Sequence, residues 1–416
     1  MTADIADIQA ARDRTLREEL VTDWGVSHAL KEIDRRQSGF GLRTRRSLLT
    51  GALRLTKAMA PGPHRALAAC RELLGYTRPV ELYVRPDPHM QAFCTRSVSG
   101  PIIIGVSSRL LETFTENELR FVLGHELGHA LFDHFQIPMP LTATLEDVGG
   151  RFVTRPVQLK LYLWCRAAEV SADRCGVACA GGSDPAAMAL FKLASGLSGT
   201  TIAPDLNAFT SQLDALLASP AACADARDEE DVLDCFDTHP YSPLRVRALA
   251  AYAKSAAFHR AIGLPATGAS NEELERVVER DLSIMEPNYL EDSTEESIEM
   301  RKLLYCAGVC VAAANGEIHP NESRALRALL GKRVEISDKP DQLEEVKREL
   351  VEKLAIGKAW PVVARAQIVQ HATIIAAADG VVQPSELAVL FDIAEGLGID
   401  PDVIDQTLAG AAAPMD

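Results

Sequence analysis

The sequence predicts a mainly α-helical protein of the α+β class, in which a domain with a small β-sheet precedes an all-helical domain. Three observations support this. Aromatic residues make up only 5% of the chain, while alanine and leucine are plentiful, which favours helices over sheets. The two runs that predict strands, Val80 to Val84 and Pro101 to Val106, lie in the first half, and a helical stretch near the end repeats itself 64 positions later. The length of 416 residues indicates two or three domains.

Composition and charge indicate which kinds of binding partner the protein can have. The formal net charge is -15, which repels phosphate backbones and anionic membrane surfaces, so we expect no nucleic acid partner. A basic stretch from Arg43 to Lys57 fits a solvated helix face. The longest apolar runs fall far short of a membrane span, and no secretory signal is visible. Nine cysteines without any Cys-x-x-Cys pair fit reduced thiols in the cytoplasm.

The first 75 residues predict helices, because apolar residues recur at every third and fourth position until Pro61 to Pro63 interrupt them. Two short apolar runs, Val80 to Val84 and Pro101 to Val106, predict strands. Ser107 and Ser108 then have the character of an N-cap for a short helix.

Thr115 and Glu118 form a capping-box pattern that opens a longer helix, which we expect to run to about Phe135. Glycines, prolines and apolar periodicity predict three further helical stretches: Val157 to Ala180; residues 184 to 218 with a break near Gly196; and Pro243 to Ile262. Residues 264–295 are polar and acidic and predict a linker.

The repeat near the C-terminus pairs residues 312–322 with residues 376–386. Each copy combines an Asn-Gly or Asp-Gly turn with a Pro-x-Glu helix start. The two copies therefore predict two helical hairpins in one all-helical domain.

The pattern His125-Glu126-x-x-His129 lies inside the capped helix. Four helical residues advance about 400°, so the two imidazoles lie on one face and can bind one cation. Glu126 can then act as the base that deprotonates an attacking water. This motif predicts one zinc ion per chain. His134 lies nine residues after His125, which in a continuous helix is the opposite face, so we reject it as third ligand.

Glu169 and Asp173 are the better source of the missing ligand. They lie four residues apart on an otherwise apolar helix, where buried carboxylates need a compensating cation or hydrogen-bond donors. Glu169 would bind zinc and Asp173 would accept the other ring N–H of a ligand histidine. The alternative interpretation is a solvated acidic pair.

This set of residues resembles the gluzincin metallopeptidases, and its flanks resemble the CAAX prenyl endopeptidase and HtpX-like family. The flanking features are Gln91-Ala92-Phe93, an edge-strand-like Ile102-Ile103-Ile104, and Thr238-His239-Pro240 with Arg245. The resemblance implies a zincin-type domain whose edge strand lines the substrate cleft. It also implies that His239 stabilises the oxyanion and that Arg245 supports the site. Well-known members of that family span membranes, and this chain shows no span.

The C-terminal repeat resembles the tellurite-resistance TerB-like helical domain. That resemblance implies a metal or protein partner at the matching positions, Asn315, Glu322, Asp379 and Glu386. The alternative is that these residues only form turns and helix starts.

Together these features predict a soluble, cytoplasmic zinc metalloendopeptidase acting on protein or peptide substrates, with a regulatory or partner-binding C-terminal domain. The predicted parts are an N-terminal helical region (1–69), a metallopeptidase domain (70–263), an acidic linker (264–295) and a TerB-like domain (296–412). The rival hypothesis is a non-catalytic zinc-bearing interaction protein that acts through the helical repeat.

Overall fold

A computed structural model describes residues 5–23, 26–31, 48, 50–95, 100–137, 155–198, 205–218, 239–282, 285, 290, 295–330, 334, 336 and 339–410. Its contacts divide the chain into two compact units. The first contains residues 1–139, 164–214 and 238–282, and the second contains residues 283–416 with two shorter segments. The predicted basic patch at Arg43 to Arg46 lies outside the described residues.

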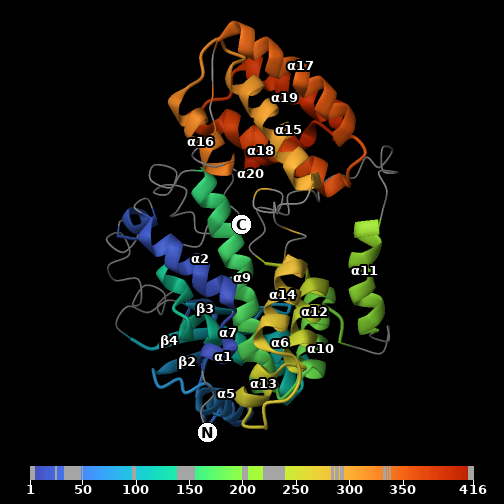
Figure 1. Ribbon diagram of the computed structural model, residues 1–416. Coiled ribbons are helices and arrows are strands. Elements are labelled where there is room, and N and C mark those ends of the chain that lie inside the picture. Colours follow the sequence, from blue (N-terminus) through green and yellow to red (C-terminus); the bar gives the residue numbers. More distant parts are fainter. Residues whose placement is uncertain are drawn as a thin grey trace. The chain divides into compact units, whose positions relative to one another are not determined.

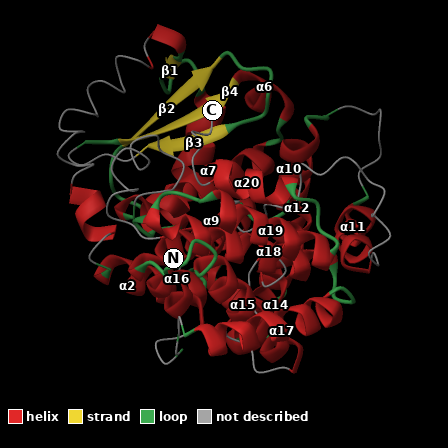
Figure 2. Ribbon diagram, turned by 90° about the horizontal axis from the view of Figure 1, so that it is seen from above, coloured by secondary structure: helices red, strands yellow, loops and turns green. Residues whose placement is uncertain are grey.

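The first unit contains one four-stranded sheet in the order β1-β2-β4-β3 (Figure 2). Its strands are β1 (Leu53–Leu55), β2 (Val80–Arg85), β3 (Ala92–Thr95) and β4 (Ile102–Ser107). Strand β2 pairs parallel with β4, whereas β1 and β3 are antiparallel to their neighbours. The predicted strands at 80–84 and 101–106 are confirmed as β2 and β4.

Two expectations about this sheet are wrong. The run Ile102 to Ile104 was expected to resemble an edge strand, but β4 lies between β2 and β3 and all six of its residues are buried. A continuous apolar run is typical of a strand covered on both faces. The edge strands are β1 and β3, and the sequence marks neither of them by alternation. The other error is β1, which lies in a stretch expected to be helical.

Helices make up the rest of the first unit (Figure 1). They are α1 (Ile5–Ile8), α2 (Ala11–Thr22), α5 (Pro61–Leu73), α6 (Ser108–Thr113), α7 (Glu116–Leu131), the 3-10 turn η1 (His134–Gln136), α9 (Arg155–Ala180), α10 (Ser183–Ser195), α11 (Leu206–Ala218), α12 (Ser242–Ala253), α13 (Ala256–Ala261) and α14 (Asn271–Leu282). Helix α7 packs against strands β3 and β4 and against helices α5 and α10. It is therefore surrounded by the unit's core.

Helix α14 corrects the interpretation of residues 264–295 as a loosely packed linker. Leu274, Val278 and Leu282 are buried in the same apolar cluster as α7. The helix was missed because its exposed positions are so polar that the average composition hides an apolar stripe at helical spacing. The segment from Asn271 to Leu282 is thus part of the first unit's core.

The second unit is all-helical, and its described helices are α15 (Glu295–Ala312), α16 (Pro320–Leu330), α17 (Pro340–Gly357), α18 (Val362–Ala376), α19 (Pro384–Leu397) and α20 (Asp402–Gly410), with the 3-10 turn η5 (Ala377–Asp379). The predicted repeat appears as two hairpins, α15 with α16 and α18 with α19. Gly316 and Gly380 both have positive φ, 96° and 97°, which is why glycine follows Asn or Asp in each turn.

The matched polar residues of the repeat form equivalent hydrogen bonds in both copies. Asn315 and Asp379 each accept the backbone N–H two residues later. Glu322 and Glu386 each accept the backbone N–H three residues earlier, at the start of α16 and α19. One bond joins the copies, because the Asn315 amide donates to Glu386 over 2.8 Å. The turn-and-cap interpretation therefore accounts for most of their contacts.

Among the residues that the structure describes, no helix is both long and apolar enough to cross a membrane.

Candidate metal centre

Helix α7 begins where the sequence predicts. The Thr115 hydroxyl accepts the Glu118 N–H, and the Glu118 carboxylate accepts the Thr115 N–H over 2.7 Å. Lys192 of α10 also donates to Glu118 over 2.8 Å. These bonds satisfy the free N–H groups of the first turn and fix the start of α7 against its neighbour.

Small residues let α7 and α9 approach closely. A Cβ atom on Gly128 would lie 2.9 Å from the Cα of Ala172, and one on Gly176 would lie 2.6 Å from the Phe121 ring. Neither helix could hold this position with a larger side chain, because Cβ atoms do not approach other heavy atoms so closely. The contact brings the histidine face of α7 against the acidic face of α9.

Three side chains meet between these helices: His125, His129 and Glu169. The two Nε2 atoms are 3.1 Å apart. Glu169 places one carboxylate oxygen 3.3 Å from His129 Nε2 and the other 3.5 Å from His125 Nε2. One potential ligand atom from each residue lies within 4.8 Å of the others.

The outer nitrogen of each histidine points to a fixed partner. His125 Nδ1 lies 2.9 Å from Asp173, and His129 Nδ1 lies 2.9 Å from His134. Asp173 can only accept, so His125 carries its proton on Nδ1 and presents a lone pair at Nε2. This tautomer is the one that a metal ligand requires.

The donor set fits a cation such as zinc. Glu169 is 3% exposed, yet its Oε2 atom has no hydrogen-bond partner. Arg245 Nη2 lies 3.4 Å and His125 Nε2 lies 3.5 Å from this oxygen. A cation bound by the three side chains would add to the positive charge that compensates the buried carboxylate. Two imidazole nitrogens and a carboxylate that converge in this way are the ligands that zinc takes in catalytic sites.

The electrostatics of the site favour positive charge at its centre. Burial opposes the ionisation of Glu169, but His239, His125 and His129 outweigh it and hold the pKa of that carboxyl well below its usual value. Burial likewise opposes a charge on His125, but Glu169 and Asp173 raise its pKa above the ordinary value. Both shifts have the same cause, which is the attraction between the carboxylates and the imidazoles that surround them.

Glu126 stands apart from the other acids of the site. It is 7% exposed, and burial raises the pKa of its carboxyl despite the opposing effect of the two histidines. A carboxylate whose pKa is raised in this way can accept and return a proton more readily near neutral pH.

Arg245, in the first turn of α12, and His239, just before that helix, both reach the centre. Arg245 donates two hydrogen bonds to Asp173, of 2.7 and 2.8 Å, and lies 3.4 Å from Glu169. His239 Nε2 lies 3.5 Å from Glu169, and its side chain is 56% exposed. His239 therefore lies at the open side of the centre, whereas the Arg245 side chain is only 13% exposed. Thr238 is outside the described residues.

His134 requires a correction. The sequence argument placed it on the far face of a helix running to Phe135, but α7 ends at Leu131. Asp133 then adopts a left-handed conformation, with φ of 53°, and turns the chain back. His134 consequently lies beside His129 and is buried. It is not among the three convergent ligands, so its rejection as third ligand stands for a different reason.

A helix that carries His-Glu-x-x-His against an acid from a second helix is the arrangement of a metallopeptidase domain. Comparison with known proteins agrees with this class. Residues 64–253 match the model of peptidase family M48, and residues 301–408 match that of tellurite resistance protein TerB. The chain thus carries a region similar to the M48 peptidases, followed by a region similar to TerB.

One curated relative is plastoglobule-localized metallopeptidase 48 of the chloroplast of Arabidopsis thaliana. It is 31% identical over 202 residues, which make up 46% of this chain and 57% of the relative. The aligned part therefore spans little more than half the relative's length. No solved structure matches the chain.

Proposed function

We propose that this chain is a zinc-dependent metalloendopeptidase that hydrolyses peptide bonds in protein substrates. The observation that supports it best is the convergence of the His125, His129 and Glu169 side chains, whose potential ligand atoms lie within 4.8 Å of one another. Glu126 follows the first of these ligands on the same helix. The match to a peptidase family and to a relative named as a metallopeptidase supports the same activity.

Zinc held by His125, His129 and Glu169 would polarise the peptide carbonyl and make a water easier to deprotonate. Glu126 is the general base in this proposal. It takes the proton from the attacking water and passes it to the amine that leaves. Its raised pKa suits both transfers.

His239 and Arg245 have different parts in the proposal. The exposed His239 ring can donate a hydrogen bond to the negative oxygen that forms on the substrate carbonyl. Arg245 does not reach substrate, because both of its bonds go to Asp173. It holds Asp173, which in turn holds the ring of His125.

Strand β3 offers a place for the substrate backbone. It is the last strand of the sheet, pairs only with β4 among the described strands, and packs against the helix that carries the histidines. An extended peptide can add to such an edge through backbone hydrogen bonds. We propose that substrates bind here, which agrees with the resemblance to the CAAX prenyl endopeptidase and HtpX-like family.

The variant Glu126→Gln tests the mechanism. It removes the base but none of the ligands, so we expect zinc binding to persist while cleavage of a casein substrate falls by about 10²–10⁴-fold. Glu116→Gln, at the exposed start of the same helix, is the matched control and should cleave normally. Undiminished cleavage by Glu126→Gln would refute the mechanism. Zinc binding by the wild type without cleavage of any peptide would favour a non-catalytic interaction protein.

We also propose that the C-terminal domain (296–412) regulates or targets the peptidase, within the domain boundaries expected from the sequence. Removing residues 296–416 should change the rate or range of substrates cleaved. Unchanged activity on a broad set of proteins would contradict this. A cytoplasmic location likewise stays a prediction, because the Arabidopsis relative is named for plastoglobules in the chloroplast.

A further inference from the structure

A chain of hydrogen bonds leads from the candidate ligand His129 to the N-terminal helix. His129 Nδ1 lies 2.9 Å from His134 Nδ1, and His134 Nε2 lies 3.1 Å from a carboxylate oxygen of Asp13. Asp13 belongs to α2 and is separated from His134 by 121 residues. Asp13 is fully buried and His134 is 1% exposed.

Asp13, the last residue in this series of hydrogen bonds, determines which nitrogen atoms of the two histidines carry protons. Asp13 accepts the indole N–H of Trp164 over 3.0 Å, the hydroxyl of Ser171 over 2.8 Å and the amide of Gln9 over 3.0 Å. An indole N–H can only donate, so it faces an acceptor, and three donors around one side chain fit an ionised carboxylate. His134 must then donate from Nε2 to Asp13.

The position of the proton on His134 in turn determines the tautomer of the candidate ligand His129. If His134 has its proton on Nε2, its Nδ1 atom is an acceptor, so His129 must donate from its own Nδ1. His129 is then left with a lone pair at Nε2, the atom that faces Glu169 and His125. The charge on Asp13 thereby selects the metal-binding tautomer of a histidine that it does not touch.

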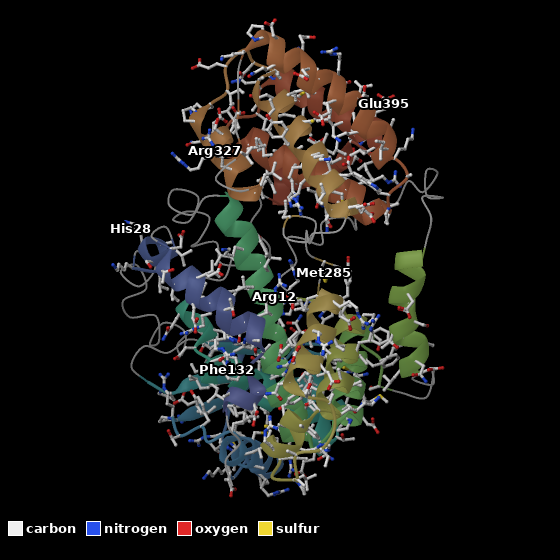
Figure 3. All side chains as sticks on the ribbon, viewed as in Figure 1. Arg12, His28, Phe132, Met285, Arg327 and Glu395 are labelled. Atoms are coloured by element: carbon white, nitrogen blue, oxygen red, sulfur yellow. The ribbon has the colours of Figure 1, made fainter. Side chains whose placement is uncertain are left out.

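The ring of His134 is also held in place by its neighbours. Trp164 packs edge-on against it with ring centroids 5.7 Å apart, and Phe132, labelled in Figure 3, lies at the same centroid distance. Helix α2 is fastened by other bonds, among them that from the Ala10 N–H to Ser171 over 3.0 Å. The helix that carries Asp13 is thus anchored to the helix that carries Glu169.

We propose that Asp13 and His134 are positioning residues of the metal centre, through which the N-terminal helix α2 orients the zinc ligand His129. This inference rests on the proposed zinc site. In this proposal, helix α2 supports the metal centre directly and does not merely cover it. His125 is oriented directly by Asp173, whereas His129 is oriented by an acid acting through a second imidazole.

The test measures zinc affinity by competition with a chelator, on full-length apo protein whose fold is checked by circular dichroism. Asp13→Asn keeps the shape and an oxygen acceptor but loses the charge. His134→Phe keeps a ring but removes the hydrogen bonds that link His129 to Asp13. Loss of such supporting partners weakens metal binding by about 10–100-fold, which we expect for each variant. The double variant should bind zinc no more weakly than the weaker-binding single variant, because both substitutions interrupt the same series of hydrogen bonds.

A control variant on the same helix separates positioning from simple packing. Arg12→Ala removes the bond from α2 to Glu279 on α14 and touches neither Asp13 nor His134. Arg12 is labelled in Figure 3. This control should bind zinc within about twofold of the wild type. Cobalt substitution adds a spectroscopic measurement, since a displaced His129 changes the absorption bands of bound cobalt.

Zinc affinity within twofold of the wild type in Asp13→Asn and His134→Phe, with cobalt spectra unchanged, would overturn the proposal. If His134→Phe does not fold, His134→Gln, which keeps polar atoms at the position, provides the same comparison. A wild type that binds no zinc would instead refute the proposed function, so the two failures are distinguishable.

Discussion

His125 and His129 lie one turn apart on α7, yet their outer nitrogens reach acids from different parts of the chain. Asp173 receives the bond from His125, and Asp13 receives the one relayed from His129 by His134. Each acid has other strong donors, Arg245 for Asp173 and Trp164 for Asp13. The orientation of both rings is therefore set by buried groups that cannot easily turn toward other partners.

Replacing Asp173 with alanine should weaken both zinc binding and the fold. The change removes the acceptor for His125, which costs about 10–100-fold in metal affinity. It also removes both hydrogen bonds of Arg245 to Asp173 and leaves Glu169 as its nearest acid. We expect this loss to destabilise the fold by up to about 3–5 kcal/mol. Chelator competition and urea unfolding measure the two effects. Asp214→Ala, at a side chain that is 71% exposed, is the control and should change neither. Equal zinc affinity in both variants would contradict the prediction.

At the scale of single residues, the sequence predicts what local spacing can specify. His125, Glu126 and His129 follow from a motif, and the helical spacing of Glu169 and Asp173 puts both acids on one face. His134 could not be predicted, because its position depends on one left-handed residue, Asp133. Asp13 had no signal, since a single acid in an N-terminal helix has no local pattern that links it to a distant histidine.

At the scale of elements, the centre depends on how closely α7 and α9 pack. Gly176→Ala should force them apart, because its Cβ atom would lie 2.6 Å from the Phe121 ring and 2.7 Å from its carbonyl oxygen. Overpacking of this kind costs about 1–3 kcal/mol. We expect weaker zinc binding as well, since the two helices carry different ligands.

Urea unfolding and chelator competition measure both consequences of Gly176→Ala. Gly62→Ala, in the first turn of α5, is the matched control, because the atom nearest to its Cβ would be 3.9 Å away. That variant should be as stable as the wild type or slightly more so. Gly176→Ala with normal stability and normal zinc affinity would show that the helices can adjust.

Glu322, at the start of α16, leads us to expect that the stability of the fold depends on pH. Burial, with Glu386 and Asp379 nearby, raises the pKa of Glu322 from 4.5 to about 7. An acid with a raised pKa in the folded state binds its proton more tightly there than when unfolded. Its contribution to stability is thus present at low pH and lost as pH rises from 4.5 toward 7. Glu322→Gln keeps the oxygen that accepts the His319 N–H and cannot ionise.

The variant should match the wild type at pH 5 and exceed its stability by about 1–3 kcal/mol at pH 8. Chemical unfolding at several pH values measures this difference. Comparing the two proteins is necessary because buried His371, whose pKa burial lowers to about 4, has the opposite effect on the wild type as pH falls. A difference that stays constant with pH would contradict the assignment.

The elements that the sequence predicts well have strong local signals. The capping box of α7 and the two repeat turns are where expected, since each depends on residues within a few positions. The order of strands is a different matter. The place of β4 between β2 and β3 depends on parallel pairing with β2, across the strand β3 that intervenes in the sequence, which no local pattern encodes.

At the scale of the whole molecule, the chain has two separate apolar cores. One cluster includes α7, α14 and the sheet, and the other includes α15, α18 and α19, with no residue in common. We expect two transitions in calorimetry. Excess zinc at about 100 times its dissociation constant stabilises the binding unit by about 2.7 kcal/mol.

Removing zinc with a chelator should therefore lower one transition by several degrees and leave the other unchanged. The isolated segment 296–412 should reproduce the insensitive transition. A single transition that moves as a whole on zinc removal would show that the two cores unfold together.

The reach of α2 into the metal centre also determines when the centre can form during synthesis. Asp13 leaves the ribosome first, followed by the histidines of α7, then Glu169, and Arg245 only after more than half of the chain has been made. A nascent chain that ends before Glu169 has two histidines but not the third ligand. If the proposed function holds, the order of residues thus keeps the proposed peptidase centre incomplete while the unfolded nascent chain lies close to it.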